Sequence, residues 1–125
     1  MGKVTGVLID VMAGRAIVYT VKSGTLEEYY RILNCTTFDI ATRRIGTGVY
    51  DIYCDDEGLL QCNPIVSAVS DDRHPMLVGN LFIAKTNDEG ETISLSTEEI
   101  DEVLGHIITL GDVSGRTWHA LICGY

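Results

Sequence analysis

The sequence predicts an α+β fold: a mainly antiparallel β-sheet built from hairpins, with two amphipathic α-helices. Runs of β-branched and aromatic residues flank short glycine turns, and two capping boxes each open a stretch with helical periodicity. Strands and helices do not alternate regularly, whereas a parallel sheet needs a crossover after each strand. With 125 residues, the chain is expected to form a single domain, residues 1–125, around one core.

The first expected elements are a hairpin and a helix. Residues 4–12 and 16–21 have the composition of strands, with Ala13-Gly14-Arg15 as the turn between them. The capping box Thr25-Leu26-Glu27-Glu28 then starts a helix that is expected to end at Asn34. The apolar residues spaced to form its buried face are Leu26, Tyr29, Tyr30 and Leu33.

A central hairpin follows, and we expect the sheet to be centred on it. Residues 38–45 and 49–54 are rich in β-branched and aromatic residues, and Gly46-Thr47-Gly48 separates them. The acidic stretch Asp55-Asp56-Glu57-Gly58 reads as a solvated turn. The adjacent pair Arg43-Arg44 lies just before the glycine turn, so the hairpin tip is the first place to look for a bound anion.

The second half is expected to contain strands at residues 76–85, 91–95 and 116–123, with an acidic turn at residues 87–90. A second helix starts at the capping box Ser96-Thr97-Glu98-Glu99. Gly111 is the expected end of this helix, and its apolar positions are Ile100, Val103, Leu104, Ile107 and Ile108.

Composition restricts the partners. The net charge of −9 and the pI near 4.5 repel polyanions, so long nucleic acids are not expected to bind, whereas a few arginines can still attract a small anion. The opening Met1-Gly2-Lys3 and the residues after it resemble neither a signal peptide nor a membrane span. We expect no cofactor and no metal, because the four cysteines form no CxxC pair and match no closed zinc site.

A ligand-binding face is predicted on the strand at residues 76–85. Side chains two apart share a face, so Asn80 and Phe82 lie side by side, next to Gly79. A ring for stacking and an amide for hydrogen bonds suit a nucleobase. The alternative is a sheet that is buried on both faces, with Phe82 as a core residue.

Three arginines are candidates for binding phosphate. Arg43 and Arg44 are adjacent on a strand, so their side chains point to opposite faces, and Arg116 lies at the start of the last strand. The alternative for each is a solvated side chain or an ion pair with one of the many acids. Catalytic motifs are missing, because His74, His106 and His119 form no HExxH or Cys–His pattern, so no enzyme activity is expected.

Several motifs resemble those of a known family. The run TRRIGTGVYDIYCDDEGLLQCNP, then MLVGNLFIA, NDEGE and SLSTEEI, resembles a small domain family of unassigned function that is common in phages. Within that set, the chain is most similar to the phage Thoeris anti-defence proteins of the first type. The opening KVTGVLID supports this closer resemblance.

This resemblance implies a non-catalytic sponge in the cytoplasm of an infected bacterial host. Such a protein sequesters cyclic nucleotide immune signals, chiefly glycocyclic ADP-ribose and in some members cyclic di- or trinucleotides, and so blocks Thoeris or CBASS defence. It also implies a homo-oligomer, a dimer or hexamer, with Phe82, Asn80 and the arginines at the ligand. The rival functions are a phage protein that inhibits a host protein by direct contact and a small cyclic nucleotide hydrolase using His74 or His119.

Overall fold

The fold is mostly antiparallel β-sheet with two helices, which agrees with the predicted α+β class. The computed structural model describes residues 3–11, 13–22, 25–56, 65–111 and 114–124. The helices are α1 (Leu26–Leu33) and α2 (Thr97–Gly105). The strands are β1 (Val4–Asp10), β2 (Arg15–Val21), β3 (Phe38–Ile45), β4 (Gly48–Asp55), β5 (Val66–Val69), β6 (Pro75–Val78), β7 (Leu81–Thr86), β8 (Thr92–Ile93), β9 (Ile107–Gly111) and β10 (Thr117–Ile122).

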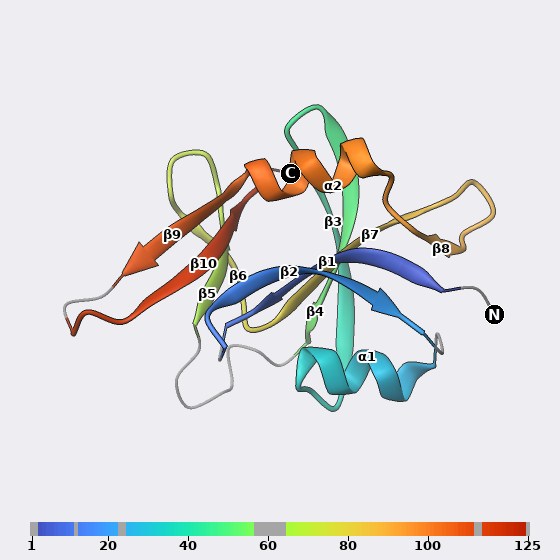
Figure 1. The fold of residues 1–125 in the computed structure, drawn as a ribbon, viewed down its shortest axis with the longest axis horizontal. Coiled ribbons are helices and arrows are strands. Elements are labelled where there is room, and N and C mark those ends of the chain that lie inside the picture. The colour runs from blue at the N-terminus through green and yellow to red at the C-terminus, as the bar shows by residue number, and fades with distance from the viewer. Residues whose placement is uncertain (1–2, 12, 23–24, 57–64, 112–113, 125) are drawn as a thin grey trace.

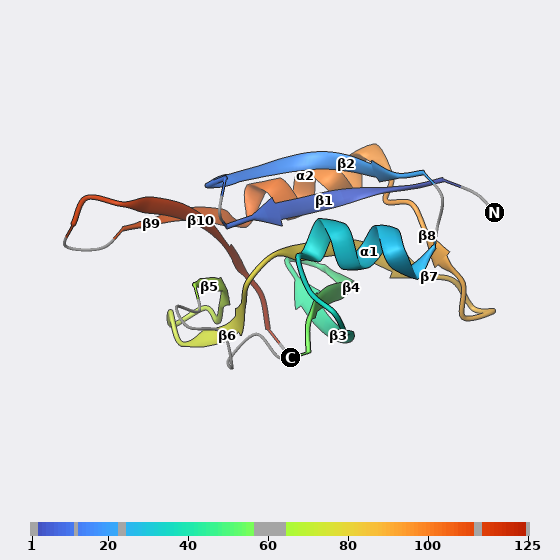
Figure 2. The same ribbon diagram turned by 90° about the horizontal axis from the view of Figure 1, so that it is seen from below.

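The strands form two sheets (Figure 1). The large sheet has the order β2-β1-β7-β4-β3, and β8 pairs with β7. Figure 2 shows this order from β2 at the top to β3 at the bottom. The small sheet has the order β6-β5-β10-β9, in which β5 and β10 are parallel. The large sheet is therefore centred on β7, and the expectation that it is centred on β3 and β4 is wrong, because β3 is an edge strand.

Both faces of the large sheet are buried around its central strands, and the two helices lie on opposite sides of it (Figure 1). On one face, α1 contributes Tyr29, Ile32 and Leu33 to a cluster that includes Phe82 and Tyr53. On the other face, α2 and the small sheet cover a second cluster; it includes Val7, Ile9, Tyr50, Ile52, Ile83, Val103 and Leu121. Residues 81–84 of β7 are buried throughout, since their alternating side chains enter these two clusters.

The two predicted hairpins are present. Strands β1 and β2 pair over all seven residues of each, and β3 pairs with β4 from Phe38–Asp55 to Ile45–Gly48. The second turn is thus one residue shorter than expected, because Gly48 is already in β4. Gly46 has a φ of +61°, a conformation that favours glycine. The end of the DDEG stretch, residues 57–58, lies outside the described residues.

The strand expected at residues 76–85 is two strands in different sheets. β6 ends at Val78 and β7 begins at Leu81, and between them Gly79 has a φ of +80°. A positive φ redirects the chain, and glycine adopts it without the steric penalty of a side chain. Asn80 therefore lies at the junction between the sheets and not within a strand.

Both helices begin where the capping boxes predict. The Ser96 side chain accepts from the Glu99 backbone N–H and the Glu99 carboxylate accepts from Ser96, while Thr25 accepts from Glu28 at 3.4 Å. Asn34 ends α1 in the left-handed conformation, as expected. Leu26, however, is exposed and Ile32 takes its place on the buried face of α1.

Helix α2 is shorter than predicted. It ends at Gly105 with His106 as its C-cap, so Ile107 and Ile108 belong to β9, and Gly111 closes that strand instead of the helix. Ile107 and Ile108 are adjacent β-branched residues, which favour a strand. Pairing of β9 with β10 stabilises the extended conformation of these two residues.

Candidate functional site

A cavity of about 350 Å³ lies between β1, β2 and the C-terminal end of α1. This volume is within the range of small-molecule sites, which is roughly 300–1,000 Å³. Its walls combine apolar side chains with two guanidinium groups, two amides and one carboxylate. The lining residues are Leu8, Asp10, Arg15, Ile17, Tyr19, Arg31, Ile32, Asn34 and Asn80.

The strand register brings the cavity side chains to one face. Arg15, Ile17 and Tyr19 alternate along β2 and so point to the same side of the sheet. Across the β1–β2 pair, Asp10 is opposite Arg15 and Leu8 is opposite Ile17. The floor of the cavity is therefore the part of the α1 face of the sheet that α1 leaves open.

Arg15, Arg31 and Asp10 are the charged residues that line the cavity. The Arg31 guanidinium donates to the Tyr19 hydroxyl at 3.2 Å and lies 3.7 Å from the Glu28 carboxylate. The hydrogen bond to the Tyr19 hydroxyl raises the pKa of Arg31 above its usual value. Within the described part of the chain, the Arg15 side chain has no hydrogen bond or ion pair. The Asp10 carboxylate on the opposite strand accepts from the backbone N–H of Ala13 at 3.1 Å.

Asn80, one of the predicted site residues, lines this cavity. Its side-chain oxygen accepts from the Val11 N–H and its amide nitrogen donates to the Ile32 carbonyl, both at 3.0 Å. The residue is only 8% exposed. An amide has two donor hydrogens and two acceptor lone pairs, so these two bonds leave part of its capacity for a ligand.

Phe82 lies beneath the cavity and does not line it. The ring is fully buried in the α1-side cluster, which corrects the expectation of an open Phe82–Asn80 face and agrees with the alternative interpretation of a core residue. Its centroid is 6.5 Å from that of Tyr19, and the two rings are nearly perpendicular. The ring that a ligand in the cavity would meet is therefore that of Tyr19.

The three predicted arginines are not among the residues that line the cavity. Arg44 is exposed, and its backbone exchanges two hydrogen bonds of 2.8 Å with Gly124. Arg43 is half-buried, and its guanidinium donates to the Thr42 carbonyl at 3.0 Å. Arg116 is exposed in the connection between β9 and β10. The structure thus does not bring these arginines together with Phe82 in one site.

Sequence reasoning missed Arg15, Tyr19 and Arg31. Arg15 was assigned to a turn, and Arg31 is a polar position of a helix that was analysed only for its apolar face. The spacing Arg15-x-Ile17-x-Tyr19 was a usable pattern, because it places a cation and a ring on the same face of a strand. The contribution of Arg31 depends on how α1 packs, which the sequence does not reveal.

Groups suited to catalysis are lacking among the described residues that line the cavity: Asp10 is the single acid among them, and none of them is a histidine, cysteine, serine or lysine. Elsewhere, burial raises the pKa of the Cys54 thiol and that of Cys35 to about 11, so neither is an activated nucleophile at neutral pH. Within the described ranges, no group of three or more His, Cys, Asp or Glu residues is arranged to hold a metal ion. No described helix has the length and apolarity needed to span a membrane.

Comparison with known protein families shows which family the chain belongs to. The sequence profile described as "Domain of unknown function (DUF3846)" matches residues 4–108, which is most of the chain. The chain belongs to this family. The DUF3846 match includes every residue that lines the cavity and ends in β9, so β10 and Arg116 lie beyond it. No curated protein and no solved structure matches the chain.

Proposed function

We propose that this DUF3846 protein is a non-catalytic sponge that binds and sequesters cyclic nucleotide immune signals. The ligands are glycocyclic ADP-ribose and, as a second group, cyclic di- or trinucleotides, and their capture blocks Thoeris or CBASS defence in the cytoplasm of an infected bacterium. The observation that carries the proposal is a cavity with two guanidiniums and a tyrosine ring in a chain of net charge −9. The motif resemblance to phage anti-defence proteins supports it independently.

The cavity residues have complementary roles in this proposal. Arg15 and Arg31 bind the phosphates, because a guanidinium offers paired donors that match phosphate oxygens. Tyr19 packs against the base, and its hydroxyl holds the Arg31 guanidinium at 3.2 Å. Asn80 and Asn34 supply amide groups for a base edge or a ribose.

Sequestration requires tight binding without turnover. The described residues that line the cavity include no pair of nucleophile and general base, which fits that requirement. The homo-oligomer that the resemblance implies, a dimer or hexamer, stays a prediction. Arg43, Arg44 and Arg116 do not line the cavity and have no role in the binding proposed for it.

The test is capture followed by release. Purified protein is mixed with glycocyclic ADP-ribose isomers and with cyclic di- and trinucleotides, free ligand is removed, and the complex is heated. We expect unaltered ligand to be released only on heating, as identified by mass spectrometry. Release of chemically altered ligand would show that the protein is a cyclic nucleotide hydrolase, and His74 and His119 would then be the candidate catalytic residues.

Direct inhibition of a host protein is the second candidate. The observation that favours it is exposed apolar surface, which includes Val18, Leu26 and Val49 at 50%, 57% and 58% exposure. In the same experiment this function predicts that none of the cyclic nucleotides is captured. A failure to capture any of them, with the protein shown to be folded by circular dichroism, would contradict the sponge.

A further inference from the structure

Asp10 is the single acid among the described residues that line the cavity, and the fold binds only one of its two carboxylate oxygens. That oxygen accepts from the backbone N–H of Ala13 at 3.1 Å. Within the described part of the chain, the other oxygen has no hydrogen bond. Asp10 and Arg15 are directly opposite in the β1–β2 pair, yet they form no ion pair. A charged hydrogen-bond acceptor is therefore available to a ligand in the cavity.

A carboxylate discriminates between the groups of a ligand, because it accepts hydrogen bonds and donates none. It repels phosphate, whose oxygens are also negatively charged acceptors, and it attracts groups with neighbouring donors. The vicinal diol of a ribose has two such donors, and dinucleotide-binding folds commonly bind ribose hydroxyls with an Asp or Glu side chain. The edge of adenine offers a donor beside an acceptor, which suits the amides of Asn34 and Asn80 better.

The strand register places Asp10 at the phosphate end of the cavity and away from the tyrosine ring. Arg15 and Tyr19 are four residues apart on the same face of β2, which separates them by about 13 Å along the strand. Asp10 is opposite Arg15, whereas Gly6 is opposite Tyr19. Every phosphate of the cyclic ligands proposed above is bonded to a ribose. With the base at Tyr19 and a phosphate at Arg15, the group that reaches Asp10 is thus a ribose.

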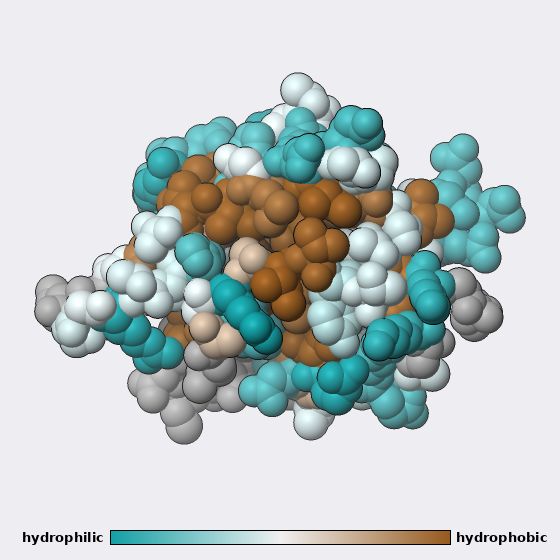
Figure 3. Space-filling model, in the orientation of Figure 1, coloured by the Kyte–Doolittle hydropathy of each residue, from teal (hydrophilic) through white to brown (hydrophobic). Residues whose placement is uncertain are grey.

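The surroundings of the cavity are polar on the α1 side. In the orientation of Figure 1, Figure 3 shows a continuous apolar area between α2 and β2 and mostly hydrophilic side chains over α1. Arg31 on α1 lines the cavity and is 68% exposed, so the cavity opens to solvent on this side. The hydroxyl groups of a ligand that enters here are therefore not forced against the apolar area, where they would lose hydrogen bonds to water.

We propose that Asp10 determines specificity by selecting ligands with a free vicinal diol on the ribose next to the phosphate at Arg15. The second carboxylate oxygen of Asp10 accepts from the diol, while the guanidinium of Arg15 binds the phosphate. The inference rests on the proposed sponge function and adds to it which chemical group the cavity recognises besides base and phosphate.

This selection separates the two ligand groups of the proposed function. In glycocyclic ADP-ribose, the second ribose is joined through its anomeric carbon and its pyrophosphate ester, so its two remaining hydroxyls form a free vicinal diol. A cyclic di- or trinucleotide uses one of the two hydroxyls of each ribose for its linkage, so it has no vicinal diol. Asp10 therefore favours glycocyclic ADP-ribose over the cyclic oligonucleotides.

The test compares two ligands by isothermal titration: glycocyclic ADP-ribose and the dideoxy analogue, in which hydrogen replaces both hydroxyls of the second ribose. The unmodified protein is expected to prefer the parent ligand by about tenfold or more, because the analogue leaves a charged acceptor unpaired. Asp10→Asn keeps an oxygen for the Ala13 N–H but replaces the second acceptor by an amide nitrogen. It should bind the parent ligand about tenfold more weakly and the dideoxy analogue no more weakly than before. A general disturbance of the cavity would instead weaken both ligands equally.

The matched control is Asp39→Asn. Asp39 is an exposed aspartate on β3 that does not line the cavity, and its carboxylate also accepts from a nearby backbone N–H, that of Ile40 at 2.8 Å. This variant removes the same charge from the molecule, and its preference for the parent ligand should equal that of the unmodified protein.

Equal affinity of the unmodified protein for the two ligands would overturn the role of Asp10 and leave the sponge function standing, as would capture of cyclic di- or trinucleotides alone. An Asp10→Asn variant that keeps the full preference would overturn it too. A folded protein that binds none of these ligands would contradict the sponge function and this inference together. If Asp10→Asn does not fold, as judged by circular dichroism, a crystal structure of the unmodified protein with glycocyclic ADP-ribose decides the matter. A ribose hydroxyl within hydrogen-bond distance of the Asp10 carboxylate would support the proposal, and a base or no ligand group there would contradict it.

Discussion

Phe82 and Asn80 connect the large sheet to α1, Phe82 by packing and Asn80 by hydrogen bonds. The Phe82 ring contacts Tyr29 and Tyr53 at centroid distances of 6.1 Å, and these two tyrosines stack on each other at 4.9 Å. Asn80 connects the Val11 backbone to the Ile32 carbonyl at the end of α1. Both residues therefore stabilise the wall of the cavity, and only Asn80 also reaches its surface.

Phe82→Ala is expected to destabilise the protein instead of selectively removing ligand binding. Loss of a fully buried phenyl ring typically costs about 3–5 kcal/mol, because a cavity remains. Urea unfolding followed by circular dichroism measures this loss, and Val49→Ala, at an exposed position, is the control. A Phe82→Ala variant with normal stability and no affinity would instead show that the ring contacts the ligand directly.

Tyr19 combines two roles that substitution can separate. Tyr19→Leu removes the ring and should weaken nucleotide binding by about 1–3 kcal/mol, the usual contribution of an aromatic contact to one base. Tyr19→Phe keeps the ring but removes the oxygen that holds Arg31 at 3.2 Å, so a smaller loss is expected. Isothermal titration measures both variants. Equal losses in both would show that the hydroxyl, and not the ring, is what the ligand requires.

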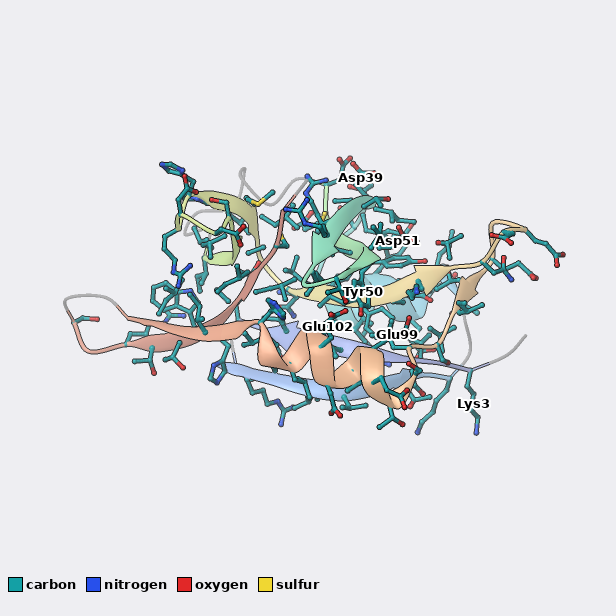
Figure 4. All side chains as sticks on the ribbon, turned by 90° about the horizontal axis from the view of Figure 1, so that it is seen from above. Lys3, Asp39, Tyr50, Asp51, Glu99 and Glu102 are labelled. Carbon is teal, nitrogen blue, oxygen red and sulfur yellow. The ribbon has the colours of Figure 1, made fainter. Side chains whose placement is uncertain are left out.

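At the scale of elements, Glu102 attaches α2 to the β3–β4 hairpin. Its carboxylate accepts from the Thr47 N–H at 3.0 Å, the Thr47 hydroxyl at 2.8 Å and the Tyr50 hydroxyl at 2.7 Å. Figure 4 shows Glu102 directed from α2 toward Tyr50. The hydrogen bond from the Thr47 backbone, followed by those from Tyr50 and the Thr47 side chain, lowers the pKa of Glu102 to about 2.

This contact predicts a specific acid sensitivity. A carboxyl whose folded pKa is lowered stabilises the fold above its unfolded pKa, and the stabilisation disappears as the pH falls toward the folded pKa. For Glu102 the window extends from about 4.5 down to about 2. The melting temperature of Glu102→Gln should therefore fall less between pH 6 and pH 2.5 than that of the unmodified protein. The control is Glu98→Gln, exposed on the same helix, and an identical fall for all three proteins would contradict the role of Glu102.

The elements that the sequence predicts well are those encoded by local contacts. Ser96 and Glu99 cap α2, and Gly46 turns the β3–β4 hairpin, because each depends on residues within a few positions. The prediction failed at residues 107–108, whose spacing also fits a helix. There, pairing with β10 outweighs the periodic pattern, and such long-range pairing is not visible in the local sequence.

At the scale of the whole molecule, the site was less predictable than the fold. Asn80 was predicted as a site residue because it lies two positions from Phe82. The strand is interrupted at Gly79, however, so the two side chains do not share a strand face. The cavity exists because α1 covers only part of the sheet, so Arg31 meets Tyr19 across 12 positions of sequence. Arg43, Arg44 and Arg116 were reasonable candidates from charge alone, yet they lie in other parts of the fold.

The distribution of charge concerns the whole molecule as well. A net charge of −9 disfavours anions generally, so affinity for a cyclic nucleotide must come from a local group of cations. Arg15 and Arg31 form such a group at the cavity, and Arg31 is 68% exposed, so its replacement leaves the core intact. Binding should also weaken as salt is added, since exposed charges are screened.

The most direct measurement is the affinity for glycocyclic ADP-ribose of two double variants and the unmodified protein, by isothermal titration. Arg15→Ala with Arg31→Ala is expected to weaken binding by about 100-fold or more, because each charge-assisted hydrogen bond contributes about 1.5–3 kcal/mol. Arg44→Ala with Arg116→Ala removes the same charge outside the cavity and should change affinity only a few-fold. The opposite pattern, with the cavity variant binding normally, would contradict the assignment of the ligand to this cavity.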